Sequence, residues 1–273
     1  MNSALANRSA RARRPCHYVW VSALFFCLIG STVFGQKQLE STQPILLSPE
    51  QAIKEGRALV DEILSMKPEE SATTGMMSIR TEKGFRQISI RFQTIITPTN
   101  WVSVYQATQS NKSENISVVH TPGQPNIYYS GSNQFMTAGS PQTGSLPTPL
   151  SDGVVLAPFA GSDFSIADLG LEFLHWPDQR LLQKEMKRSR SCRVLESINP
   201  HSVAGGYSRV RSWVDAESHG ILYAEAYDVN GKELKEFYPK DFNKVDGQWQ
   251  LHEMQISNVQ TKSTTTVKFN LDH

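Results

Sequence analysis

Histidine and cysteine, the side chains that most often hold metals or act as nucleophiles, are scattered along this chain. A zinc site on one element needs close spacing of its ligands, and the six histidines beyond residue 35 lack it: His120, His175, His201, His219, His252 and His273. Cys192 is the only cysteine beyond residue 35, so no intrachain disulfide is expected after residue 35. A lone cysteine in a strand-like run is most simply a small buried hydrophobic residue. The sequence predicts no metal and no cofactor.

The serines and carboxylates of the sequence also show no catalytic pattern. A nucleophile elbow has the pattern G-x-S-x-G between a strand and a helix, whereas residues 206–210 lack the second glycine and precede a predicted strand. No strand-like segment leads into Gly161-Ser162-Asp163. Near turns and strand ends a carboxylate usually accepts hydrogen bonds from backbone amides, and this is the role expected of Asp168, Asp215, Asp228 and Glu253. The sequence therefore predicts a non-enzymatic protein with no catalytic residues.

The first 35 residues have the form of a secretory signal peptide. Four arginines between Arg8 and Arg14 precede an apolar run, Val19 to Phe34, and the small residue Gly35 offers a cleavage position. A membrane anchor is the alternative, because the apolar run is only slightly shorter than the roughly 20 residues of a spanning helix. Cleavage would reduce the 27 basic residues to 23 against 26 acidic ones, a net charge of −3, which disfavours nucleic acid as a partner. We expect a periplasmic monomer.

After a flexible tether over residues 36–47, residues 48–273 are predicted to form a single domain that begins with a helix. Ser48-Pro49-Glu50-Gln51 supplies an N-cap, a proline at the first helical position and a capping-box glutamine, and the helical spacing continues to Met66. From Gly75 the apolar period changes to two. In the strand over residues 85–96, one face carries Ile88, Ile90, Phe92 and Ile96, and the other carries Gln87, Ser89, Arg91 and Gln93. Shorter strands are expected over residues 101–107, 116–120 and 127–130.

The second half of the chain begins with a long loop over residues 132–158. A short helical segment follows from Gly161, and then a basic strand over residues 184–198. Residues 207–271 predict a β-meander, in which Asn230-Gly231 suits a type I′ turn and Asp246-Gly247 marks the next turn. The fold class that follows is mainly β (α+β): a half-open antiparallel β-barrel of roughly ten strands covered by about two to three helices.

A half-barrel of that size is too large for two or three helices to fill, so we expect an apolar cavity beneath them. The candidate lining residues are Met77, Ile88, Ile90, Phe92, Trp101, Phe164, Met254 and Ile256. Methionine makes such a lining adaptable, because its side chain is unbranched. Each of these residues is also compatible with an ordinary core. A filled core would indicate an interaction or structural protein of the cell envelope, and a polar triad inside the cavity would indicate a lipid hydrolase.

The order and spacing of several short motifs over residues 75–271 resemble the LolA/LolB-like outer-membrane lipoprotein-sorting proteins, in particular their divergent LolA-like branch. These motifs are Ser162-Asp163-Phe164-Ser165 with Asp168-Leu169, Trp213-Val214-Asp215, Ala226-Tyr227-Asp228, Gly231-Lys232 with Lys235, Gly247 with Trp249, and Glu253-Met254.

This resemblance implies a carrier whose apolar cavity shields the acyl chains of a lipoprotein or another lipid and aids outer-membrane lipoprotein sorting. Envelope proteins of the inner or outer membrane would then be further partners. Carriers of this family hold their lid helices with an arginine on the sheet, and no motif in the present sequence singles out that arginine.

Overall fold

A computed structural model describes residues 47–110, 112–131, 148–245 and 248–271 of the 273-residue chain. The predicted signal peptide, residues 36–46 of the tether and the Asp246-Gly247 turn lie outside these residues. Within the described residues, no helix combines the length and the apolar character needed to span a membrane.

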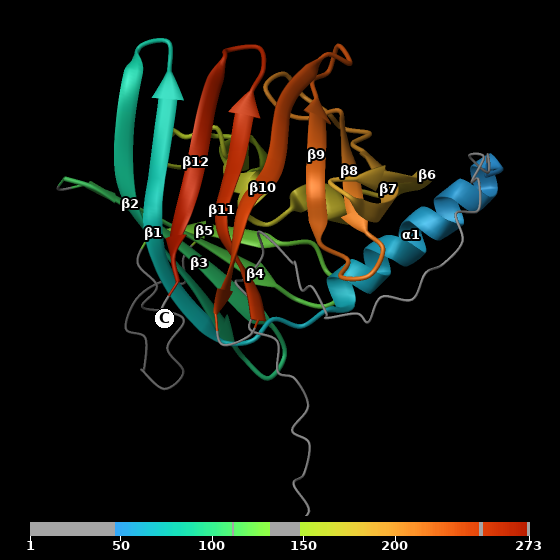
Figure 1. Ribbon diagram of the computed structural model, residues 1–273, viewed down its shortest axis with the longest axis horizontal. Coiled ribbons are helices and arrows are strands. Elements are labelled where there is room, and N and C mark those ends of the chain that lie inside the picture. The colour runs from blue at the N-terminus through green and yellow to red at the C-terminus, as the bar shows by residue number, and fades with distance from the viewer. Residues whose placement is uncertain (1–46, 111, 132–147, 246–247, 272–273) are drawn as a thin grey trace, which may run out of the picture.

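One antiparallel sheet of twelve strands forms the body of the domain (Figure 1). Its strands are β1 (Ser71–Thr81), β2 (Gly84–Ile96), β3 (Trp101–Gln109), β4 (Lys112–His120), β5 (Ile127–Ser130), β6 (Asp178–Lys187), β7 (Arg190–Ile198), β8 (Arg209–Asp215), β9 (Ile221–Tyr227), β10 (Glu233–Val245), β11 (Gln248–Asn258) and β12 (Ser263–Asn270). They lie in the order β5-β4-β3-β2-β1-β12-β11-β10-β9-β8-β7-β6, so the end strands β5 and β6 do not pair and the sheet stays open. The predicted fold class is confirmed, with two more strands than expected.

Helix α1 (Pro49–Ser65) begins where the sequence predicts. The Ser48 hydroxyl accepts a hydrogen bond from the Gln51 amide at 3.2 Å. The Gln51 side chain, however, bonds to Glu55 at 2.9 Å and does not complete the expected capping box. The helix packs on β6, and a Cβ at Gly56 would lie 2.6 Å from the backbone oxygen of Gln179. Glycine therefore allows the two backbones to approach closely.

Between β5 and β6 the chain leaves the sheet and forms a set of short turns, here called the insertion (residues 148–177). It contains α2 (Asp152–Val155), η2 (Phe159–Gly161), α3 (Ile166–Leu169) and η3 (Glu172–His175). A single short helical segment was expected from Gly161 onward. The structure breaks it, because Leu171, two residues after the end of α3, adopts a left-handed φ of 49°. In Figure 1 the yellow-green insertion lies behind strands β10–β12.

The alternation predicted for β2 is confirmed over most of the strand. Ile88, Ile90 and Phe92 are buried, whereas Ser89 and Arg91 are exposed. Ile96 was expected on the buried face but is 44 % exposed, because it is the last residue of β2 and borders the turn into β3.

The inner face of the sheet carries two hydrophobic clusters, and Phe237 packs against both. The first joins β1–β5, β11 and β12 to the insertion, and the second joins β6–β9 to α1 and η3. A smaller cluster on the opposite face contains Cys192, Val194, Trp213 and Leu222. Cys192 is fully buried there, as expected for a small hydrophobic residue. The inner face is thus covered along its whole width.

Two local predictions for the second half of the chain were wrong. The basic run over residues 184–198 is not one strand but the β6–β7 hairpin, which turns at Arg188 and Ser189 with φ values of 53° and 62°. The β9–β10 connection is a five-residue loop, Asp228–Lys232, and Gly231 is its only residue with positive φ. A type I′ turn needs positive φ at both central residues. Here Asp228 shapes the loop instead, by accepting hydrogen bonds from the amides of Asn230 and Lys232.

Candidate functional site

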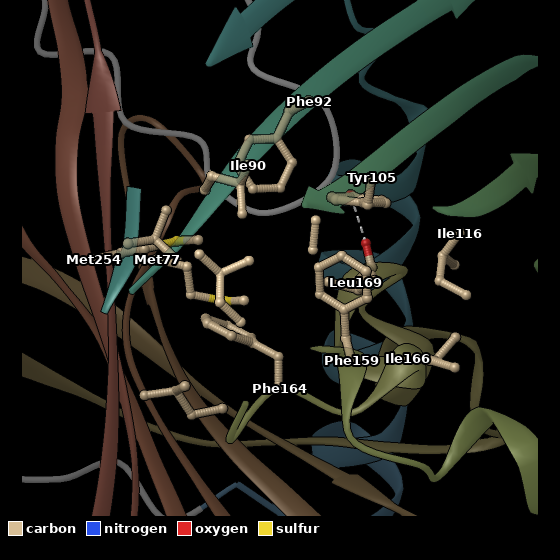
Figure 2. Packing of buried hydrophobic residues seen from close by; sticks show 14 of the residues in the cluster. Met77, Ile90, Phe92, Tyr105, Ile116, Phe159, Phe164, Ile166, Leu169 and Met254 are labelled. Carbon is tan, nitrogen blue, oxygen red and sulfur yellow. Dashed lines mark hydrogen bonds between the residues drawn. The ribbon is translucent and has the colours of Figure 1, made fainter. Parts of the chain in front are cut away.

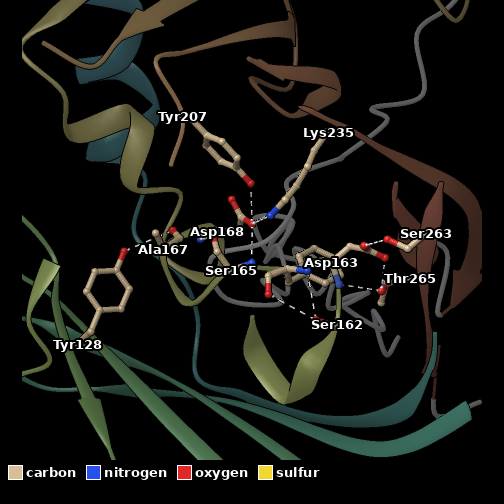
Figure 3. A network of polar contacts seen from close by, with 11 residues as sticks. Tyr128, Ser162, Asp163, Ser165, Ala167, Asp168, Tyr207, Lys235, Ser263 and Thr265 are labelled. Atoms are coloured by element: carbon tan, nitrogen blue, oxygen red, sulfur yellow. Dashed lines mark hydrogen bonds and ion pairs between the residues drawn. The ribbon is translucent and has the colours of Figure 1, made fainter. Parts of the chain in front are cut away.

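Asp163 fastens the insertion to β12. Its carboxylate accepts hydrogen bonds from the hydroxyls of Ser263 and Thr265, and its amide donates to Thr265 Oγ1 at 2.9 Å (Figure 3). All three residues are buried. Hydrogen bonds to an ionised carboxylate are about twice as strong as neutral ones. This contact is therefore a strong polar anchor between two segments that are about 100 residues apart in the chain.

Arg86 on β2 makes a second attachment. Its guanidinium donates hydrogen bonds to the backbone oxygens of Ala160 and Gly161 at 3.1 and 2.6 Å. Gly161 has a φ of 63°, and a Cβ there would lie 2.5 Å from Arg86 Nη2. Glu114 on β4 accepts a hydrogen bond from the Ala160 amide at 3.1 Å. An arginine on the sheet thus binds the peptide backbone of the insertion, and the absence of a side chain at Gly161 leaves space for the guanidinium.

Tyr105 on β3, Tyr128 on β5 and Asn126, which directly precedes β5, bond to further groups of the insertion. Tyr105 donates to the backbone oxygen of Leu169 at 2.7 Å. Asn126 donates to the oxygen of Gly170 at 2.8 Å, and Tyr128 donates to the Glu172 carboxylate at 2.8 Å. One backbone bond, from the Leu150 amide to the Tyr128 oxygen at 2.8 Å, also joins the insertion to β5, and the other bonds described here use side chains of the sheet.

Two openings lie beside the insertion. The inner pocket, of about 40 Å³, is lined mainly by Phe164, Leu171, Phe173, Val210, Ile221, Ala224, Ala226, Phe237 and Ile256. The outer cleft, of about 570 Å³, is more polar and is bordered by β5, the insertion and the β7–β8 loop. Four residues line both openings: Asp168, Phe173, Tyr207 and Lys235. The two spaces therefore adjoin at these side chains.

Three of the shared residues, here called the polar trio, are bonded to one another. Asp168 accepts hydrogen bonds from Tyr207 at 3.0 Å and from Lys235 at 3.4 Å (Figure 3). Burial, together with the nearby Asp168 charge, raises the pKa of Tyr207 well above its usual value. Tyr207 consequently keeps its proton and remains a donor to Asp168.

The structure divides the eight candidate lining residues into three groups. The largest group lies in the first cluster together with Phe159, Phe164 and Leu169 of the insertion (Figure 2). Its members are Met77, Ile88, Ile90, Phe92 and Met254. Phe92, for example, makes an edge contact with Tyr105 at 5.3 Å between ring centroids. Phe164 and Ile256 line the inner pocket. Trp101 lies apart, stacked on His120 at 5.2 Å beside a separate cleft of about 320 Å³.

The same architecture occurs in known structures. The chain matches a DUF1329 family protein from Desulfovibrio piger with a TM-score of 0.62 at 19% identity, over 80% of this chain and 91% of that one. It matches a domain assigned to outer membrane lipoprotein sorting from Vibrio parahaemolyticus with a TM-score of 0.64 at 17% identity, over 80% and 92% of the two chains. A LolA superfamily protein from Nitrosomonas europaea matches with a TM-score of 0.53 at 13% identity, over 81% and 92%. The chain has the LolA fold.

Comparisons of the sequence with known families give less information about this LolA-type chain than the structural matches do. A family model described as "Uncharacterized protein" matches residues 148–271, which begin at the insertion and extend to β12. No curated protein matches the chain.

Within this LolA-type fold, most of the isolated acids have the structural role expected of them. Asp215 accepts hydrogen bonds from the amides of Glu217 and Ser218, and Asp168 accepts one from the Ser165 amide in a capping box. Glu253 differs, because it pairs with Lys240 at 2.6 Å. Among the described residues, no group of three or more histidines, cysteines or acids has the arrangement of a metal site.

A serine–histidine contact that the sequence did not suggest lies under the insertion. Ser103 Oγ is 3.0 Å from His120 Nε2. Ser103 is fully buried, and burial lowers the pKa of His120 to about 4. A neutral buried pair of this kind does not supply the accessible nucleophile that a hydrolase requires.

Sequence reasoning missed Arg86, Tyr207 and Lys235 as site residues and gave Asp163 no role. One signal was available for the two cations. Arg86 has the strand parity of Ile88 and Ile90, and Lys235 that of Phe237, so each is a charged side chain at an inward position. Such an exception to the alternation indicates either a partner or a ligand.

We expect stability to fall in mild acid because of His120. The unfolded chain binds a proton at this histidine near pH 6.5, whereas the folded chain does so only near pH 4. The free energy of unfolding should therefore decrease by about 2 kcal/mol from pH 7.5 to pH 5.0 through this residue. His175, whose pKa burial also lowers, adds to this loss. Burial raises the pKa of Glu172, which acts in the opposite direction because its folded form takes up a proton more readily.

Urea unfolding at the two pH values measures this difference. His120→Gln should flatten the pH dependence, and His201→Gln, at an exposed loop position, should not change it. Equal pH dependence in wild type and His120→Gln would show that His120 does not cause the effect.

Proposed function

We propose that this protein is a non-enzymatic carrier that binds acyl chains of lipids or lipoproteins between the inner face of its sheet and the insertion. The observation that carries the proposal is the attachment of an apolar insertion to an apolar sheet face by side-chain contacts, with a pocket already open at their border. The LolA fold supports the same function, because one of the matched structures is assigned to lipoprotein sorting. We further propose export to the periplasm by the signal peptide in residues 1–35.

The inner pocket is too small for a whole acyl chain, so the insertion has to move during binding. Phe159, Phe164, Ile166 and Leu169 now occupy the space against the sheet that a chain would take. An acyl chain that displaces them gains about 0.8 kcal/mol per buried methylene, or about 8 kcal/mol for ten methylenes. This gain offsets the loss of the insertion's own packing. Binding by exchange of one apolar surface for another requires no catalytic group.

Arg86 is proposed to hold the closed state, as the sheet arginine of the LolA-type carriers does for their lid helices. Its two hydrogen bonds go to backbone oxygens and lie at the exposed end of the contact, where water can replace them. The Asp163 anchor is buried and is the stronger of the two. The insertion would then open on the Arg86 side and remain attached to β12.

Replacing Arg86 with leucine tests the proposal. The variant should bind a fluorescent acyl probe roughly 5 to 10 times more tightly than wild type, because a smaller part of the binding energy is used to open the insertion. Arg91→Leu is the matched control, since Arg91 is exposed on the other face of the same strand. Mass spectrometry of the recovered lipid should show no chemical change.

A second candidate function is supported by the filled core. Met77, Ile88 and Met254 are at most 2 % exposed and face the insertion rather than a void. A core that never opens would indicate a structural or interaction protein of the envelope. If neither wild type nor Arg86→Leu binds any acyl probe, this second function replaces the first.

A further inference from the structure

The outer cleft and the inner pocket adjoin, and the chemistry of their lining changes from one to the other. The inner end is lined by hydrocarbon side chains, among them Phe237 and Ile256. The polar trio follows at the junction, because Asp168, Tyr207 and Lys235 line both spaces. Asp152 and Glu172 line only the outer cleft. From inside to outside, the lining is therefore apolar, then polar with the Lys235–Asp168 ion pair, then anionic.

The Lys235 ammonium has one long polar contact and lies 5.1 Å from the centroid of the Tyr207 ring. Its contact with Asp168 Oδ2 is 3.4 Å, and the same oxygen accepts shorter bonds from the Ser165 amide at 2.7 Å and from Tyr207 at 3.0 Å. Asp168 therefore remains well bonded if Lys235 turns away. An ammonium group has three donors, and at 14 % side-chain exposure Lys235 has limited access to water. The site is suited to an oxyanion that approaches from the cleft.

The outer wall of the cleft has the opposite character. Neither Asp152 nor Glu172 forms an ion pair with a cation within the described ranges. The Asp152 charge acts on Glu172, and burial together with this charge raises the pKa of Glu172. In the same wall the Asn126 amide donates to the Gly170 oxygen at 2.8 Å and also interacts with the His120 ring. Glu172 accepts hydrogen bonds from Tyr128 at 2.8 Å and from Asn126 at 3.3 Å, but neither donor is a cation, so the two carboxylates of this wall have no positively charged partner among the described residues.

We propose that the cleft binds a zwitterionic lipid headgroup of the phosphoethanolamine type, with its phosphate on Lys235 and its ammonium against Glu172 and Asp152. This inference rests on the proposed acyl-chain carrier function, because the hydrocarbon tail of the same lipid enters the inner pocket. In such a lipid the phosphate lies between the tail and the ammonium. The order of groups in the ligand matches the order of groups along this lining.

Other headgroups fit the cleft less well. A purely anionic head satisfies Lys235 but faces the two outer carboxylates, and like charges repel. A neutral glycerol head leaves both the lysine and the carboxylates without charged partners. A zwitterion supplies each end of the cleft with a charge of the opposite sign. Specificity of this kind depends on attraction at one group and repulsion at another.

Three lipids with the same dodecanoyl chain test the inference in competition with a fluorescent acyl probe: lysophosphatidylethanolamine, lysophosphatidic acid and monoacylglycerol. Wild type should bind the zwitterion most tightly, about 10-fold more tightly than monoacylglycerol. Lys235→Met should remove the advantage of both phosphate-bearing lipids, weakening them far more than it weakens monoacylglycerol. Glu172→Gln should remove the advantage of the zwitterion over lysophosphatidic acid. Phosphoethanolamine without a tail should not displace the probe.

The possible failures can be told apart. If no lipid binds, the carrier function itself is wrong. If the three lipids bind equally, or Lys235→Met weakens all of them equally, the carrier function stands and the headgroup inference is overturned. Displacement by tail-free phosphoethanolamine would identify a site for the free headgroup and would also overturn it. Should Lys235→Met fail to fold, the headgroup preference of Lys235→Arg compared with Lys235→Gln decides the same point, because arginine retains the charge.

Discussion

Replacing Phe92 with aspartate is expected to unfold the domain at ambient temperature or to lower its free energy of unfolding by at least about 4 kcal/mol. Phe92 is 5 % exposed and packs between Tyr105 and Phe269, with ring centroids at 5.3 and 5.4 Å. The substitution removes an aromatic side chain from a filled core, which alone costs about 3 to 5 kcal/mol. It also places a carboxylate in an apolar site.

Ser89→Asp is the matched control for Phe92→Asp. Ser89 lies on the same strand but faces solvent, so its replacement should change stability by less than about 0.5 kcal/mol. Chemical denaturation of the two variants measures the difference. Similar losses at both positions would mean that the alternation of β2 is not as described.

Replacing Asp163 with alanine should release the insertion while leaving the sheet folded. The substitution removes the acceptor of two buried hydroxyls, those of Ser263 and Thr265. Hydrogen bonds to a charged group contribute about 1.5 to 3 kcal/mol each, so a loss of about 3 kcal/mol is expected for local closure. This corresponds to about 100-fold faster amide hydrogen exchange in residues 163–169. Exchange in the central strands β1 and β12 should change far less.

Asp152→Ala, at an exposed acid of the same insertion, is the control for this experiment. Unaltered exchange in residues 163–169 of Asp163→Ala would show that the apolar contacts alone hold the insertion. If the carrier function is correct, Asp163→Ala should also bind acyl probes more readily than wild type. It would then resemble Arg86→Leu, with a larger effect because the Asp163 anchor is buried.

The sequence alone determined most of the strands, the β6–β7 hairpin excepted, and most of their faces. A period of two sends neighbouring side chains to opposite sides of a strand, and a slip of one residue would expose a whole apolar set. The inward positions of Ile88, Ile90 and Phe92 and the N-cap at Ser48 follow from such local rules. The resemblance carried by the short motifs agrees with the observed fold, because it depends on their order along the chain.

Only the tertiary structure decided what covers the inner face and where an opening remains. The sequence predicted a cavity beneath the helices, but Phe159, Phe164 and Leu169 of the insertion fill most of that space. Local patterns do not show which apolar surface a loop will contact after more than 70 residues of intervening chain. The Arg86 contact with Gly161, the Asp163 contact with Thr265 and the polar trio all join segments that are distant in sequence. Their energies depend on distances that only the folded sheet sets, which is why the candidate site could not be read from residue types and spacing.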